Sequence, residues 1–255
     1  MKTTAYLFFL ILLFYQHTLS AQIVNIEERR ITGTNDSTYW YGSLRLGANV
    51  SKVKDKIFQF NSTGHLQYKR GKTLTLLLLD GKFLQAGNTD FNQSAFAHLR
   101  FNYKLTEILV AETYAQLQYN KLLLIELRAL TGIGLRFQML KSKDGQQRIY
   151  SGLSYLYEHN QFLEGVPDQS LHRLSSYISF TFRPWEGVKL VNTTYYQPSI
   201  SRFANYRMAT EWRLDTPLGK KLTFFTEFTF STDQSLPVEA PTSVYAWLNG
   251  LAFKF

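Results

Sequence analysis

The sequence contains no cysteine in its 255 residues, so no disulfide bond and no thiolate metal site can form. A lipid anchor attached to an N-terminal cysteine is excluded for the same reason. Histidine is scarce as well, and the five present form no His-x-His or His-x₃-His pair. An aspartate-rich calcium loop is also lacking. The sequence therefore predicts no metal site and no cofactor.

Long apolar runs are lacking except at the N-terminus, where residues 6–15 read YLFFLILLFY. This run follows the positive charge of Lys2 and precedes residues 19–21 (LSA), which end in a small residue. Residues 1–21 are therefore predicted to be a secretory signal peptide that is cleaved near Ala21. The alternative is a retained anchor, which is disfavoured because a spanning helix needs roughly 20 apolar residues.

No segment after Ala21 has the length and apolarity of a membrane-spanning helix. A membrane location for the mature chain then requires a closed barrel, because lipid offers no hydrogen-bond partner to an open sheet edge. The 20 phenylalanines and 16 tyrosines fit a barrel with aromatic girdles at both membrane interfaces.

Acidic residues are outnumbered, since 19 Asp and Glu stand against 28 Lys and Arg and give a formal net charge of +9. Removal of Lys2 with the signal peptide would leave +8. A basic balance suits nucleic acid or another acidic surface, but export makes nucleic acid an unsuitable partner. The predicted partners are outer-membrane lipids, lipopolysaccharide phosphates and small anions. A merely solvated basic surface is the alternative.

Period-two alternation of apolar and polar residues runs from Tyr39 onward, in segments of about ten residues separated by turns. Leu99 and Phe101, for example, alternate with His98 and Arg100. Charges two positions apart fit a strand, whereas a helix would space them three or four apart. Twelve such segments begin near residues 39, 57, 73, 93, 108, 123, 147, 171, 187, 203, 221 and 243. The third and the ninth alternate least clearly.

The predicted fold is an all-β, antiparallel transmembrane β-barrel of about twelve strands with short loops, covering residues 38–255. The polar residues 22–37 are predicted to form a periplasmic lead-in. The connections at 70–72, 105–107, 141–146, 184–187 and 216–220 would be periplasmic. Those at 51–56, 85–92, 120–121, 161–170, 198–202 and 233–242 would lie outside.

The last segment places four apolar residues on one face and ends on an aromatic residue. This pattern predicts a closing strand that pairs with the first strand and engages the barrel-assembly machinery. An ordinary last strand of a soluble β-sandwich is the alternative, and the alternation along the whole chain disfavours it. The four residues are Trp247, Leu251, Phe253 and Phe255.

The polar faces of the predicted strands carry many charges, which we expect to face the lumen. In one interpretation they pair with one another and close a narrow barrel. In the other, the surplus of arginine lines a pathway for small anions. The candidates are Arg45, Arg100, Glu112, Arg128, Arg136, Glu158, Arg173, Arg183, Arg207, Glu211, Arg213 and Glu227, with Lys69 on the same face.

Some barrels act on lipids with Ser, His and a carboxylate or amide. Residues 158–160 (EHN) and 170–172 (SLH) would lie near the outer rim, where such chemistry would occur. No lipase motif with a characteristic spacing accompanies them, so an enzyme is disfavoured. The glycines at 132 and 134 follow no nucleotide-binding pattern and are interpreted as sites of close packing.

Five stretches of the mature chain share a recognisable order: 131–137 (TGIGLRF), 152–158 (GLSYLYE), 173–177 (RLSSY), 195–198 (YYQP) and 206–207 (YR). Together they resemble a family of outer-membrane barrels of undetermined function, often labelled salt-induced outer membrane proteins. The resemblance covers most of the mature chain and is strongest from about residue 128 onward. It implies a barrel fold and an outer-membrane location in a Gram-negative bacterium, and Gln22 after the export signal is compatible with Bacteroidota.

The sequence thus predicts an exported outer-membrane barrel with a structural, envelope-stress or narrow small-anion role. A lipid-modifying barrel enzyme is one alternative. An accessory subunit that docks on a larger outer-membrane assembly is the other, which the short loops would suit.

Overall fold

The computed structural model describes residues 38–253, apart from 53–55, 88 and 220. The predicted signal peptide, the lead-in and Phe255 therefore lie outside the described residues. No helix in this part of the chain is long and apolar enough to cross a membrane.

Twelve antiparallel strands form one sheet, in which each strand pairs with its neighbours in sequence. The all-β fold, the strand count and the short loops are confirmed, and every predicted strand start lies within four residues of the observed one. The strands are β1 (Tyr39–Lys52), β2 (Lys56–Arg70), β3 (Thr73–Ala86), β4 (Thr89–Lys104), β5 (Leu109–Asn120), β6 (Ile125–Lys141), β7 (Arg148–Phe162), β8 (Gln169–Phe182), β9 (Lys189–Pro198), β10 (Tyr206–Pro217), β11 (Leu222–Asp233) and β12 (Ser243–Phe253).

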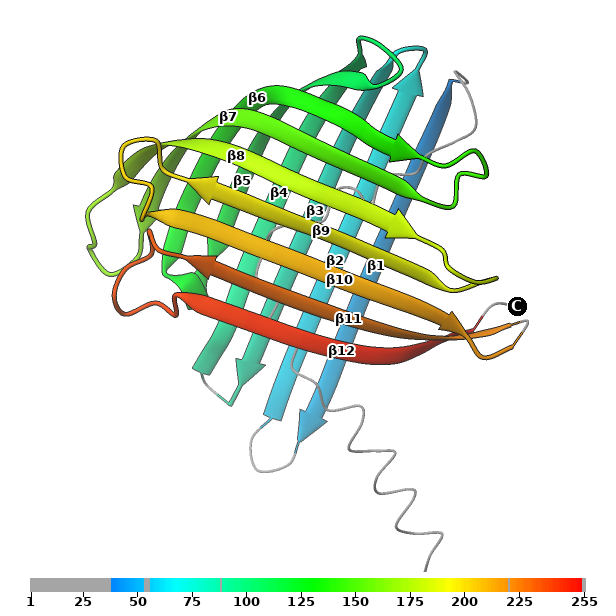
Figure 1. Ribbon diagram of the computed structural model, residues 1–255. Coiled ribbons are helices and arrows are strands. Elements are labelled where there is room, and N and C mark those ends of the chain that lie inside the picture. The colour runs from blue at the N-terminus through cyan, green and yellow to red at the C-terminus, as the bar shows by residue number, and fades with distance from the viewer. Residues whose placement is uncertain (1–37, 53–55, 88, 220, 254–255) are drawn as a thin grey trace, which may run out of the picture.

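The sheet curls into a barrel in which β1 to β5 form one wall and β6 to β12 form the facing wall (Figure 1). Because the strand count is even, β1 begins and β12 ends at the same end of the barrel, called here the terminal end. The opposite end is the loop end. Among the described residues no pairing between β1 and β12 is present, so contact of the last strand with the first stays a prediction.

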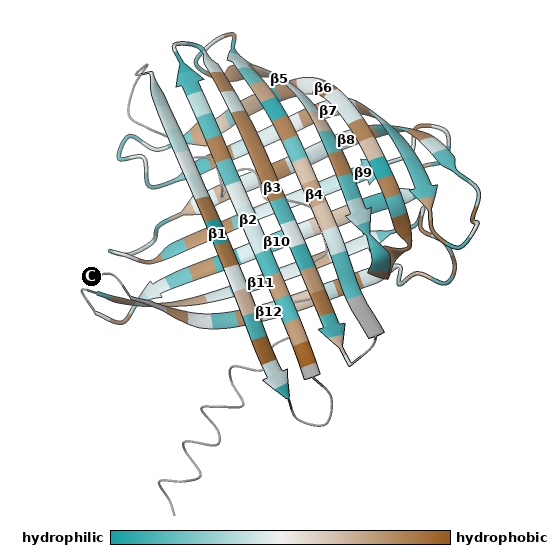
Figure 2. Ribbon diagram, turned by 180° about the vertical axis from the view of Figure 1, so that it is seen from behind, coloured by the Kyte–Doolittle hydropathy of each residue, from teal (hydrophilic) through white to brown (hydrophobic). Residues whose placement is uncertain are grey.

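Hydrophobic and hydrophilic residues alternate along many of the strands (Figure 2). The burial of side chains shows that this alternation separates an apolar outer surface from a largely polar interior. Leu99 and Leu117, for example, are about half exposed on the outside, whereas Arg100 and Gln118 beside them are buried. The weak alternation of β3 has a physical cause, because both of its faces carry leucine. Leu76 and Leu78 point inward and are fully buried.

The loop end is covered by an apolar cluster, which we call the loop-end cap. A short 3₁₀ helix, η1 (Lys121–Leu123), contributes to it and begins at Asn120, whose side chain accepts a hydrogen bond from the Leu123 amide at 3.1 Å. Side chains from two neighbouring loops pack against the cluster, so apolar contacts tie these loops to the ends of the strands. The cap comprises Leu123, Ile125, Phe162 and Val244, with Val166 and Leu236 packed against them.

Two glycines leave room for tyrosine rings that lie over neighbouring strands. Gly132 pairs with Tyr114 and Gly152 pairs with Tyr177 in the strand register. A Cβ atom at either glycine would overlap the tyrosine ring opposite. The prediction of close packing at residue 132 therefore agrees with the structure, and each pair holds an aromatic ring flat against the wall.

Candidate functional site

The interior between β6 and β11 contains a buried group of charged side chains, here called the Glu158 network. Its members come from strands that are not all adjacent, and the curl of the sheet brings them together. Each lies at an inward-facing position of its strand and is buried. The network comprises Arg128, Glu158, Asn160, Arg173, Arg207 and Asp233.

Glu158 is fully buried and lies among three guanidinium groups. Its Oε2 atom lies 2.8 Å from Nη2 of Arg207. Its Oε1 atom lies 3.7 Å from Nε of both Arg128 and Arg173, and Asn160 donates a hydrogen bond to it at 2.9 Å. One carboxylate therefore compensates several buried cations, which would otherwise be strongly unfavourable in the interior.

Asp233 supplies the second carboxylate of the network. It accepts a hydrogen bond from Nη2 of Arg128 at 2.9 Å, and its other oxygen accepts bonds from the hydroxyl and backbone amide of Ser235. The prediction that Asp233 belongs to an outer connection is wrong, because Asp233 is the last residue of β11 and is buried. The alternation along the strand indicates the buried position, because Asp233 lies an even number of residues from Glu227 and Ser231 and therefore on the same inward face.

Arg173 anchors the network to the turn between β9 and β10. It donates hydrogen bonds to the backbone oxygens of Gln197 at 3.0 Å and Asn205 at 3.2 Å. The Gln197 side chain accepts a bond from Nε of Arg207 and donates one to Ser175, both at 2.8 Å. The N–H donors of the guanidinium groups outnumber the acceptor atoms of the two carboxylates, and neutral amides thus supply further hydrogen-bond acceptors.

A second buried group, the Glu112 network, lies between β4, β5 and β8. Glu112 accepts hydrogen bonds from Nη1 of Arg100 at 3.0 Å and from the hydroxyl of Tyr177 at 3.1 Å. Arg100 also donates to Nε2 of His98 at 3.4 Å, and the other ring nitrogen of His98 lies 3.1 Å from Oε1 of Gln116. This network crosslinks the two facing walls of the barrel.

The cavity between the two networks has a volume of only ≈ 40 Å³. His98, Tyr177, Gln197 and Arg207 are among the residues that line it. Such a volume holds about two or three water molecules. The side chains of the two networks therefore leave little space between them.

Arginine exceeds acid among the described buried residues, with five arginines against three carboxylates. Arg136 is one of the five, and its guanidinium lies 3.7 Å above the Tyr150 ring. The others are Arg100, Arg128, Arg173 and Arg207, against Glu112, Glu158 and Asp233. The interior thus has an excess of positive charge, which favours anions over cations.

The remaining predicted residues lie outside both networks. Arg213, half buried on β10, contacts Asp215 at 3.0 Å and Glu227 at 3.4 Å. Glu211 is also half buried, and Arg45 on β1 is exposed. Arg183 follows the end of β8 and belongs to no strand. Among the described residues, no group of three or more His, Asp or Glu side chains could hold a metal ion.

The predicted C-terminal signature is described in part. Trp247 and Leu251 lie on the outer face of β12, with exposed fractions of 60% and 62%. Phe253 is the last residue of β12. The predicted lumen residues are all charged and do not include Asn160 and Gln197, the buried amides that join them. Only their position in the alternation of the strand indicates that these two amides face inward.

An all-β barrel of twelve strands with an ion-paired interior is the class of protein that this fold and site define. The chain belongs to the family described as "Protein of unknown function, DUF481", whose model matches residues 32–243. That description contains no reference to salt induction, so this part of the predicted resemblance stays a prediction.

A solved structure entitled "NanC porin structure in rhombohedral crystal form" is similar in shape, with a TM-score of 0.46 and 12% sequence identity. The match covers 83% of this chain and 99% of the other. A likeness of this size does not bear on function. No curated protein matches the sequence.

Proposed function

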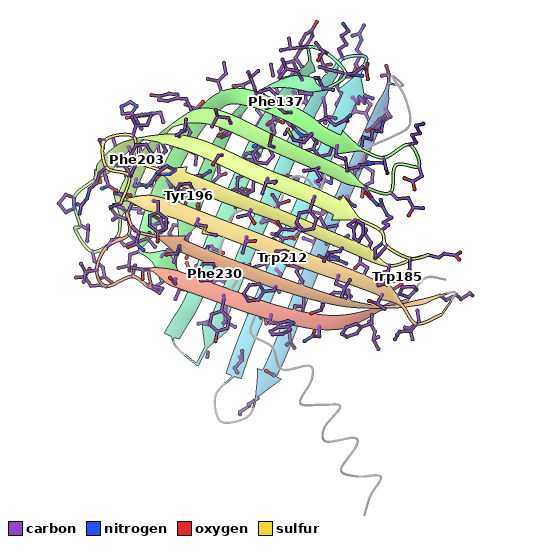
Figure 3. All side chains as sticks on the ribbon, in the orientation of Figure 1. Phe137, Trp185, Tyr196, Phe203, Trp212 and Phe230 are labelled. Atoms are coloured by element: carbon purple, nitrogen blue, oxygen red, sulfur yellow. The ribbon has the colours of Figure 1, made fainter. Side chains whose placement is uncertain are left out.

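We propose that the protein is an exported, integral outer-membrane barrel whose interior is closed at rest and whose role in the envelope is structural or stress-related. The apolar outer surface supports the membrane location, because soluble monomers rarely expose large contiguous apolar patches. Aromatic side chains near both ends fit two interfacial girdles. Phe203 lies near the loop end and Trp185 near the terminal end (Figure 3), with exposed fractions of 62% and 72%.

The Glu158 network is the main observation that supports a closed interior of the barrel. Its charged groups are buried between β6 and β11, and the adjoining cavity has room for only a few water molecules. The loop-end cap adds an apolar barrier at one mouth. Passage of a hydrated ion would require several buried ion pairs to separate, which is costly in a dry interior.

A narrow pathway for small anions is the second candidate, and the excess of buried arginine favours it. Planar-bilayer recording separates the two. The closed barrel predicts no steady current from the purified wild-type protein at either polarity. Small, anion-selective current steps would support the pathway, and large unselective steps of an open pore would contradict both.

A double substitution, Glu158→Ala with Arg207→Ala, tests whether the Glu158 network closes the interior of the barrel. It removes one member of each charge type and leaves Arg128 and Arg173 in the interior. We expect anion-selective current from this variant. The double substitution Lys143→Ala with Asp144→Ala, in the turn between β6 and β7, removes the same charges outside the interior and should stay silent.

Lipopolysaccharide, outer-membrane lipids and the barrel-assembly machinery are the proposed partners, the last through the C-terminal strand. Membrane fractionation of cells expressing the full chain tests the location, and recovery in the soluble periplasmic fraction would contradict it.

A pulldown in mild detergent tests the proposal of an accessory subunit. Recovery of the single chain alone would count against a larger outer-membrane assembly.

A further inference from the structure

A group of polar side chains on the outer surface of the barrel belongs to neither interior network. His159 lies near the end of β7, Ser170 near the start of β8, and Asp168 in the connection just before β8. The strand register places His159 directly opposite Ser170. Both strands reach the loop end side by side (Figure 1). The chain thus brings a hydroxyl, an imidazole and a carboxylate together outside the barrel.

Nδ1 of His159 lies within hydrogen-bond distance of Oγ of Ser170, at 2.9 Å. Nε2 of His159 lies 3.7 Å from Oδ2 of Asp168, which is beyond a hydrogen bond but close enough for an ion pair with a protonated imidazole. The Tyr157 hydroxyl also donates a hydrogen bond to Oγ of Ser170 at 3.2 Å. A hydroxyl next to a base that is oriented by a carboxylate is the arrangement that activates serine as a nucleophile.

An apolar groove on the same outer face extends to this group. Its volume is ≈ 440 Å³, within the range of sites that hold small molecules. Ala97, Ala115 and Ala129 give it depth, since larger side chains flank them, and Tyr157 and His159 line it. Ala129 pairs with His159 in the register, which in turn pairs with Ser170. The groove therefore leads towards the serine.

We propose that Ser170, His159 and Asp168 form a hydrolase site for long-chain fatty acyl esters, with the acyl chain held in the alanine-floored groove. The groove is apolar and open on the outer surface, where lipid chains would lie if the barrel spans a membrane. The ester group would meet Ser170 near the loop end. This activity adds to the proposed closed barrel and does not depend on whether the interior conducts.

The reaction has two balanced steps. Oγ of Ser170 attacks the ester carbonyl, and its proton passes to Nδ1 of His159 and then to the departing alcohol oxygen, leaving an acyl-serine. Water then attacks the acyl-serine, gives its proton through the same nitrogen to Oγ of Ser170, and releases the fatty acid. Asp168 stabilises the imidazolium that forms in each step by charge attraction at Nε2, and the Tyr157 hydroxyl can donate to the oxyanion.

The first experiment uses the purified full chain in detergent micelles, with p-nitrophenyl laurate as substrate and a fluorophosphonate as covalent probe. We expect laurate release and a probe adduct on the peptide that contains Ser170. Ser170→Ala should abolish both, and His159→Gln should lower hydrolysis by at least 10³-fold. Ser176→Ala, on the same outer face of β8, is the matched control and should keep full activity.

Two further variants separate chemistry from folding. Tyr157→Phe should lower kcat by about 10²-fold with little change in KM, because it removes an oxyanion donor. Ala129→Leu should raise KM for the laurate ester, because it fills the groove beside His159. Heat-modifiable gel migration, as for wild type, would show that each variant is folded.

Phosphatidylethanolamine and lipid A, each in mixed micelles, identify the natural source of the acyl ester by mass spectrometry of the released fatty acid. Wild-type protein that releases no fatty acid from any of these esters and takes no probe on Ser170 would overturn the proposal. So would hydrolysis that persists in Ser170→Ala. Either result would leave the closed barrel intact, which bilayer recording tests separately.

Discussion

At the residue scale, Glu158 lies close to more oppositely charged groups than any other side chain of its network. It is fully buried and faces Arg128, Arg173 and Arg207. Glu158→Gln leaves Asp233 to compensate these arginines alone. We expect the free energy of unfolding to fall by about 3–5 kcal/mol, as when one partner of a buried ion pair is removed. Urea unfolding in detergent micelles, followed by tryptophan fluorescence, measures the change.

Glu126→Gln is the control for this prediction. Glu126 also lies in a strand of the barrel wall, but its side chain is exposed. Its loss should change the free energy of unfolding by less than about 0.5 kcal/mol. Equal effects of the two substitutions would mean that the buried network is not a stabilising unit.

The pair formed by Gly152 and Tyr177 leads to a second prediction at this scale. Gly152→Ala places a methyl group where the Tyr177 ring lies, so the ring and its hydrogen bond to Glu112 must move. We expect a loss of about 1–3 kcal/mol, typical of overpacking. Gly47→Ala is the control, because its methyl group would meet no atom within 4 Å. Unchanged thermal stability of Gly152→Ala would contradict the packing argument.

Single residues also show how far the sequence could predict the site. Alternating parity placed Glu112, Glu158 and Arg173 on inward faces, since a strand reverses side with every residue. Which of them contact one another depends on the curl and stagger of the whole sheet. The alternation of side chains along a strand gives no information on either. The Arg128–Asp233 pair joins residues 105 positions apart and could not be predicted from local pattern.

At the scale of elements, strand starts could be predicted closely because turns and alternation mark them. The ambiguity of β3 arose because leucine occupies both of its faces, so hydropathy alone could not show which face is inward. The end of β11 was misplaced because Asp233 has a turn-forming side chain. It is nevertheless a strand residue, since Arg128 binds its carboxylate in the interior.

The stability of the turn between β6 and β7 is expected to depend on pH. The Ser142 hydroxyl and the Gln146 amide donate hydrogen bonds to Asp144 and hold the pKa of this carboxyl below its ordinary value. A lowered pKa stabilises the turn above the unfolded-state value of about 3.9, and the stabilisation is lost as pH falls through the folded value. Hydrogen exchange at the Gln146 amide should therefore become less protected, relative to an unstructured peptide at the same pH, below about pH 4.

Ser142→Ala checks the cause assigned to this effect. It removes the first of the two donors, so the pKa of Asp144 should rise towards its ordinary value and protection should be lost at a higher pH. Asp144→Asn should abolish the pH dependence. A wild-type profile that is already flat between pH 2 and about pH 6 would contradict the role of the carboxyl, since an ordinary aspartate titrates within this range.

At the scale of the whole molecule, the natural lack of cysteine permits a direct test of the closed interior. Ser175 is 2% exposed and faces inward beside Gln197. A single cysteine at this position, Ser175→Cys, should not react with a charged thiosulfonate reagent in the folded barrel. Lys143→Cys, in an exposed turn, should react at once. Rapid labelling of both positions would show that the interior is open to water.

Adding Phe162→Ala to Ser175→Cys extends this test to the loop-end cap. Phe162 packs with Ile125 and Val244 across the loop end of the barrel. Its truncation should destabilise the protein by about 3–5 kcal/mol and speed labelling of the interior cysteine. Slow labelling despite this loss would show that the ion-paired networks alone keep the reagent out.

The span of the Glu158 network along the chain has a consequence for the order in which the barrel forms. Arg128 enters with β6, but its partner Asp233 arrives only with the end of β11. Until that strand docks, Glu158 is the one carboxylate of the network that faces Arg128, Arg173 and Arg207. Burial of this excess positive charge is strongly unfavourable, so the arginines must keep part of their hydration. A partly assembled sheet is therefore expected to stay open and wet on its inner side. Dehydration of the interior would be among the last events of folding, coupled to the docking of the strands that carry the final carboxylate.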